Sequence, residues 1–183
     1  MAHTKLHEAL LTQNERLLRQ ALDLLARIDD RRYKSSPRGL APHRVCGHLR
    51  HIIEFYECFL NGLVSTHIDY DARQRDLTLE KSLAAAATRI CSIIDRLENE
   101  PALHYDNVLF VRMEDSESLN LPDPFLMSSL ARELAMLSSH TIHHFALIAM
   151  TLRAHGVAMD PDFGMAPSTL RFRERQGLIM EAT

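Results

Sequence analysis

Histidine is the residue type in this chain with the clearest potential for chemistry. The chain has eleven histidines and no tryptophan. His140 and His144 are four positions apart, so on an α-helix their side chains lie about 40° apart on one face. Two imidazoles at this spacing can bind the same cation. Thr141 stands where the HExxH motif of zinc proteases has its glutamate, so this pattern does not indicate that class of enzyme.

A third histidine on another predicted helix could complete a metal site. His48 lies in the middle of an apolar face, and His51 lies about 60° to one side of it. That face consists of Val45, Ile52, Phe55, Phe59 and Leu63. A single histidine on such a face is more often hydrogen-bonded to backbone or to a carboxylate. Three inward-facing imidazoles favour a shared divalent ion instead, with His48, His140 and His144 as its ligands. Whether His51 replaces or assists His48 stays open.

Two neighbours of these histidines are not expected to bind the ion. His143 points about 100° away from His144 on the same helix. Cys46 points about 160° away from His48, and a free cysteine is usually a small core residue.

Charged residues near the histidines have two readings each. Arg132 and Glu133 could support the ligands or pair with one another at a helix surface. Glu54 could orient His51 or His48 by a hydrogen bond, but its position on the helix predicts that it faces away from the core. Arg73 and Arg75 could bind an anionic substrate, but such loop charges more often form ion pairs with nearby acids. The acids in question are Asp69, Asp71 and Asp76.

The elements that must position the histidines are four predicted helices. Apolar residues recur at helical spacing over residues 5–28, 43–60, 78–99 and 129–154. Pro37 and Pro42 exclude a continuous helix between the first two, and Ser128 or Ser129 is the expected N-cap of the last. A strand-favouring run at 108–111, a polar turn at 114–118 and the segment 119–121 predict a short β-hairpin near 103–121. We therefore expect an all-α four-helix bundle with a hairpin insertion, as a single domain over residues 1–183.

Two segments resemble the DinB-like family of metal-binding bundles, which includes the YfiT-type proteins. They are GHLRHIIEFYECFL (47–60) and SSHTIHHFALIAMTLRAHG (138–156); elsewhere the resemblance is in helix order. It implies a four-helix bundle whose divalent ion is held by the residues matching the motifs, His48, His140 and His144. Some members activate low-molecular-weight thiols, and members often form homodimers. IDYDARQRD and FGMAPST look like features of one branch, with no chemical role assigned. His51 and the predicted hairpin depart from the pattern.

The expected chemistry depends on an open position at the ion. Three neutral imidazoles leave the cation its full charge, so an entering thiol would lose its proton, while water would support hydrolysis. Zinc or nickel suits three histidines first, and iron or copper also fits. The alternative is a non-catalytic protein with a structural metal. An open cleft at the ion would favour the enzyme, and a fourth protein ligand the structural role.

Composition narrows the partners. The formal charge is −3 without a basic cluster, which argues against nucleic acid. The longest apolar run, residues 145–152, is too short to span a membrane. Three cysteines without paired spacing and no visible signal peptide predict reduced thiols in the cytoplasm. Apolar residues outside the central stripes of two helices predict a homodimer, unless loops or the tail cover them. These residues are Leu49, Ile53, Leu60, Ile142, Ala146 and Ala149.

Overall fold

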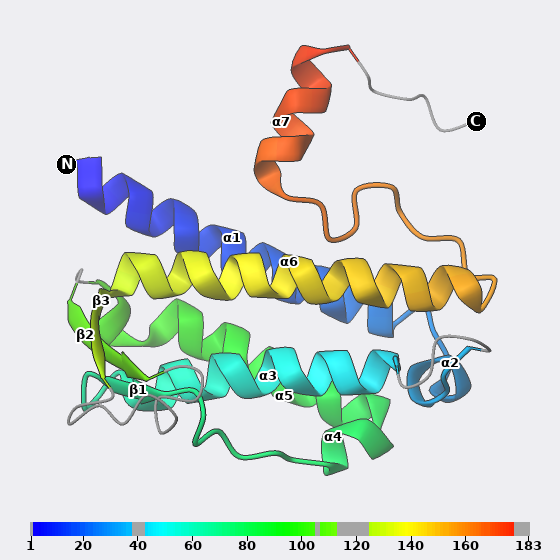
Figure 1. The fold of residues 1–183 in the computed structure, drawn as a ribbon, viewed down its shortest axis with the longest axis horizontal. Coiled ribbons are helices and arrows are strands. Elements are labelled where there is room, and N and C mark those ends of the chain that lie inside the picture. Colours follow the sequence, from blue (N-terminus) through cyan, green and yellow to red (C-terminus); the bar gives the residue numbers. More distant parts are fainter. Residues whose placement is uncertain (1, 38–42, 105–106, 113–124, 178–183) are drawn as a thin grey trace.

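Helices make up most of the structure, and a small sheet lies at one end (Figure 1). The structure is a computed structural model that describes residues 2–37, 43–104, 107–112 and 125–177. Its four long helices are α1 (Ala2–Leu25), α3 (Val45–Gly62), α5 (Leu83–Asn99) and α6 (Leu130–Ala154). Shorter ones are α2 (Asp30–Lys34), α4 (Thr78–Lys81), the 3-10 helix η1 (Pro101–His104) and α7 (Pro167–Arg175).

The long helices pack against one another in pairs. α1 and α3 each contact both α5 and α6. In Figure 1, α1 and α6 run in one direction and α3 and α5 in the other, so a long crossover joins α3 to α5. The predicted helices therefore exist close to the predicted positions. Ser129 is the N-cap of α6, as predicted, since its hydroxyl accepts a hydrogen bond from the Arg132 N–H.

The third predicted helix is divided in two. Ser82 has an extended backbone (φ −141°, ψ 113°) between α4 and α5, and its hydroxyl caps α5 by accepting from the Ala85 N–H. A serine side chain that bonds the following turn competes with helical continuation, which explains the break.

The sheet contains the predicted first strand but differs elsewhere. β1 (His67–Asp69) pairs in parallel with β2 (Val108–Arg112), which pairs antiparallel with β3 (Leu126–Ser129). The second predicted hairpin strand, 119–121, lies outside the described residues. β1 was not predicted. It packs tightly on the end of α3, where a Cβ on Gly62 would lie 2.6 Å from the carbonyl oxygen of His67.

Helix α3 is covered on most sides. It contacts α5, α6, α2, α4 and β1. Leu49, Ile53 and Leu60 on α3, and Ala149 on α6, are therefore buried within the chain. The sequence left open whether the chain itself or a second copy covers the six apolar positions outside the central stripes. The chain itself covers these four, whereas Ala146 is exposed and Ile142 partly buried.

The FGMAPST segment fastens the C-terminal tail to α6. The ring of Phe163 stacks on that of Phe145 with centroids 4.6 Å apart. Gly164 has a φ of +69°, and a Cβ there would lie 2.5 Å from the Phe145 Cβ, so only glycine fits. Pro167 then begins α7. This segment has a packing role.

Among the described helices, none is long and apolar enough to cross a membrane.

Candidate metal centre

Helices α3 and α6 bring four histidines together. These helices run antiparallel, and the first half of α3 lies beside the middle of α6 (Figure 1). His144 contacts two of the others through its two ring nitrogens. Its Nε2 lies 3.0 Å from Nε2 of His140, and its Nδ1 lies 3.0 Å from Nδ1 of His48.

Three of these histidines form a group in which one ring nitrogen of each can face a common point. The nitrogens of His51, His140 and His144 all lie within 4.8 Å of one another. The ring centroid of His51 lies 4.9 Å from that of His140 and 4.7 Å from that of His144. His48, which the sequence predicted as the third ligand, lies outside this group and adjoins it through His144. The sequence had left undecided whether His51 replaces or assists His48 as the third ligand.

The difference between His48 and His51 has a physical origin in α3. The residue at the centre of an apolar face points at a neighbouring helix when that helix is the main element covering the face. α3 is covered by several elements, so its helical phase alone does not decide which of its histidines joins His140 and His144. His51 and Phe55, one turn apart, both turn their rings toward His140.

The four imidazoles are poor bases in this environment. Burial is the largest cause and neighbouring positive charge adds to it, so the pKa of His51 and of His140 falls to about 4 and that of His144 to about 3. Burial also lowers the pKa of His48. Neutral imidazoles at neutral pH are the protonation state that a metal ligand needs.

Aromatic rings form one wall beside the group. The Phe55 ring lies 4.2 Å from the His140 ring, and Tyr70 stacks on Phe55 at 5.1 Å. The Tyr70 hydroxyl donates to the carboxylate of Glu133, which is fully buried and also accepts from the Ser128 hydroxyl at 2.5 Å. Glu133 thus fixes the aromatic wall rather than a histidine.

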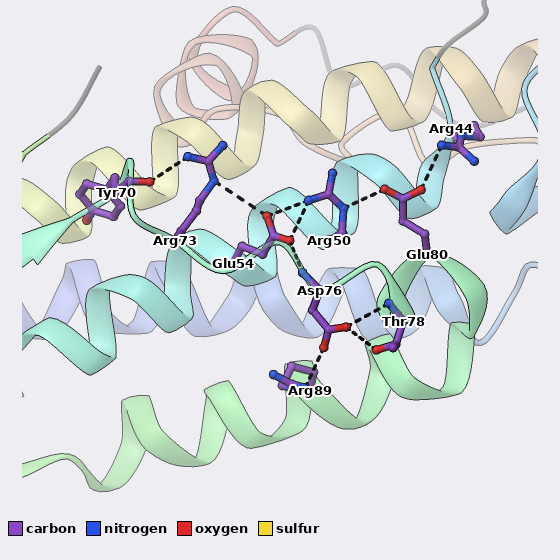
Figure 2. A network of polar contacts seen from close by, with 9 residues as sticks. All are labelled: Arg44, Arg50, Glu54, Tyr70, Arg73, Asp76, Thr78, Glu80 and Arg89. Atoms are coloured by element: carbon purple, nitrogen blue, oxygen red, sulfur yellow. Dashed lines mark hydrogen bonds and ion pairs between the residues drawn. The ribbon is translucent and has the colours of Figure 1, made fainter. Parts of the chain in front are cut away.

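A charged network holds the segment that carries Tyr70. Glu54 is almost fully buried, contrary to the prediction that it faces away from the core. Its carboxylate accepts two hydrogen bonds from Arg50, at 2.7 and 2.9 Å, and one from the backbone N–H of Asp76 at 3.0 Å (Figure 2). Arg50 also donates to Glu80. The IDYDARQRD segment is therefore β1 plus a loop tied to α3.

The histidine group lies between two hollows in the surface. One, of about 840 Å³, is lined by residues that include His51, Phe55 and His140. The other, of about 350 Å³, includes His48, His51 and His144. A small molecule could therefore approach the group from the first hollow, whose volume is in the range of small-molecule sites.

The donor set fits a divalent cation. Two ligands of one ion, each about 2.0–2.1 Å from it, are themselves about 3.0–3.4 Å apart. The Nε2 atoms of His140 and His144 already have this spacing. Cys46 is buried outside the group, and His143 is exposed. All three cysteines are free thiols.

Sequence reasoning missed the residues that surround the group. Tyr70 directly follows β1, a strand too short to be seen as a sequence pattern, and Arg50 was not considered. A signal for Arg50 existed: Arg50 and Glu54 are four apart on one helix, a spacing at which opposite charges meet.

Comparison with known proteins leaves the family unassigned. No protein-family model matches the chain, and no solved structure matches it. FK506-binding protein 5 of Rhizopus delemar is 33% identical over 118 residues. The match covers 63% of this chain but 30% of that protein, so the chain spans under a third of its relative's length.

Proposed function

We propose that the chain is a DinB-like four-helix bundle that binds one divalent cation between α3 and α6 and activates a low-molecular-weight thiol there. The observation that carries the proposal is the convergence of ring nitrogens from His51, His140 and His144 beside an open hollow. A cation held by neutral ligands lowers the pKa of a thiol that reaches it, which gives a nucleophile near neutral pH.

The residues of the chain would divide this work among them. His140 and His144 would hold the cation through Nε2, since these atoms face each other. Nδ1 of His144 would then carry the ring proton and donate to Nδ1 of His48, which orients the His144 ring. We propose that His51 is the third ligand and His48 this orienting residue. Phe55 and Tyr70 would shield one side of the group from water.

The hollow supports a catalytic rather than a structural ion. A structural site is usually closed by a fourth protein ligand, whereas a catalytic one keeps a position open. In the part of the chain that the structure describes, no carboxylate or cysteine joins the three histidines. Two of the three line the larger hollow.

A conjugation assay tests the proposal. Zinc- or nickel-loaded protein would be incubated with a panel of small thiols and an aromatic chloride, and the thioether measured against metal-free protein. We expect at least one thiol to react faster with the loaded protein, and His144→Ala to remove the acceleration. Loaded protein that accelerates no thiol would contradict thiol transfer.

A further inference from the structure

The larger hollow is positively charged as well as close to the histidines. Arg73, Arg75 and Arg132 line it. Asp71 is the acidic residue of its described lining, and it lies 4.0 Å from the guanidinium of Arg112. Cationic side chains around a recess next to a reactive site are a common arrangement for binding anions.

The aspartates expected to neutralise this charge are paired elsewhere. The carboxylate of Asp76 accepts from Arg89 at 3.3 Å and from the Thr78 hydroxyl at 2.5 Å. The carboxylate of Asp69 lies 3.6 Å from the guanidinium of Arg112. Arg75 is exposed and makes no ion pair with any residue in the described ranges. Arg132 is paired with Glu133 at 3.3 Å, so the positive charge left for a ligand at the hollow is that of Arg75 together with Arg73.

Arg73 is held in place with donors to spare. Its Nη1 donates to the carbonyl of Tyr70 at 2.8 Å, and its buried Nε has no hydrogen-bond partner and lies 3.8 Å from Glu54. Glu54 is already bound by Arg50. The remaining amino group of Arg73 has no partner among the residues drawn in Figure 2.

The position of Arg73 relates it to the histidine group. Its guanidinium carbon lies 5.0 Å above the Phe55 ring, and that ring lies 4.2 Å from His140. Two ring contacts therefore separate a fixed cation from a proposed metal ligand. A molecule lying along Phe55 would reach both.

We propose that this hollow binds the acidic group of a small anionic molecule at Arg73 and Arg75, with the rest of the molecule extending past Phe55 toward His140. Guanidinium groups bind carboxylates and phosphates through paired hydrogen bonds, so either acidic group fits. The inference rests on the proposed function only for what lies at the far end, where the thiol would meet the cation. The substrate class is then an acidic thiol or an acidic acceptor.

Calorimetric titration of the full chain tests this without any activity. Metal-free protein would be titrated with succinate, with its neutral analogue succinamide, and with inorganic phosphate. We expect succinate or phosphate to bind and succinamide to bind at least about tenfold more weakly. Binding of succinate indicates a carboxylate ligand, and binding of phosphate alone indicates a phosphate ester.

Substitutions locate the binding. Arg75→Gln should weaken the anion about tenfold, because Arg75 is exposed and its loss should not disturb the fold. Arg171→Gln, an exposed arginine on α7 away from the hollow, is the matched control and should leave affinity unchanged. Equal loss in both variants, or no binding of either anion, would overturn the inference. Zinc content is measured separately. If the chain binds the anion but no zinc, the proposed metal-dependent function is wrong and the anion site stands.

Discussion

The Nδ1 atoms of His48 and His144 lie 3.0 Å apart across the interface of α3 and α6. Two imidazole nitrogens at this distance can share a proton or face one cation. Because Nε2 of His144 faces His140, its Nδ1 is the atom left to fix the orientation of the ring. This contact separates the roles of His48 and His51.

The two histidines of α3 should therefore respond differently to substitution. His51→Ala removes a proposed ligand and should abolish tight metal binding. His48→Ala removes an orienting contact and should weaken affinity by about 10- to 100-fold. Competition with a chromogenic chelator measures both. The reverse order would make His48 the ligand, as the phase of the helix predicts.

Stability of the metal-free protein should depend on the same histidines. Their folded pKa values, about 4 for His51 and His140 and about 3 for His144, lie below the ordinary value of about 6.5. The unfolded chain thus binds more protons between these limits, so the free energy of unfolding should fall as pH drops from about 6.5 toward 4. Urea denaturation across this range measures the slope.

A variant assigns that slope to the histidine group. His140→Gln should make the fall in stability shallower, because one group that must stay neutral in the folded state is gone. His143→Gln changes an exposed residue of the same helix and serves as the control. An unchanged slope in His140→Gln would show that other groups cause the acid sensitivity.

Helix positions were predictable because their signals are local. Apolar spacing located all four long helices, and Ser129 and Gly156 mark the ends of α6 as expected. The break at Ser82 and the strand β1 were not predicted. β1 depends on a distant part of the chain, since it pairs with β2 some forty positions later, whereas the break at Ser82 comes from a local cap that apolar spacing does not reveal.

The pair His140 and His144 was predictable for the same local reason, because both lie on one helix. The partner from α3 depends on how α3 is rotated, which its neighbours decide. Glu54 illustrates this: a carboxylate on the side predicted to face water is buried by the 70–76 loop and by Arg50. Tertiary contacts set these details.

The Glu54 contact should matter for stability. Glu54→Gln keeps the shape but removes the charge that Arg50 and Arg73 face, and breaking a buried pair costs about 3 kcal/mol. Glu98→Gln, which breaks the exposed pair with Arg19, should cost under about 1 kcal/mol. Urea denaturation compares them. Equal costs would show that the network does not hold the loop.

The homodimer expected from the sequence now depends on α6. Leu49, Ile53 and Leu60 are buried within the chain, while Ala146 and Met150 remain exposed on α6. We predict a dimer that Ala146→Glu disrupts, with Ala84→Glu on the exposed side of α5 as the control. Light scattering measures the mass. A wild-type species at 20.9 kDa would contradict the prediction.

The metal content of the protein after dialysis shows whether the histidine group binds a cation. Purified wild-type protein, His144→Ala and His143→Ala would be loaded with zinc, dialysed and analysed by inductively coupled plasma mass spectrometry. We expect one zinc per chain in the wild type and in His143→Ala, and none in His144→Ala, because the ring nitrogens of His144 contact His48 and His140 while His143 is exposed. A wild-type chain that retains no zinc, or a His144→Ala chain that retains it fully, would show that these histidines do not form a metal site.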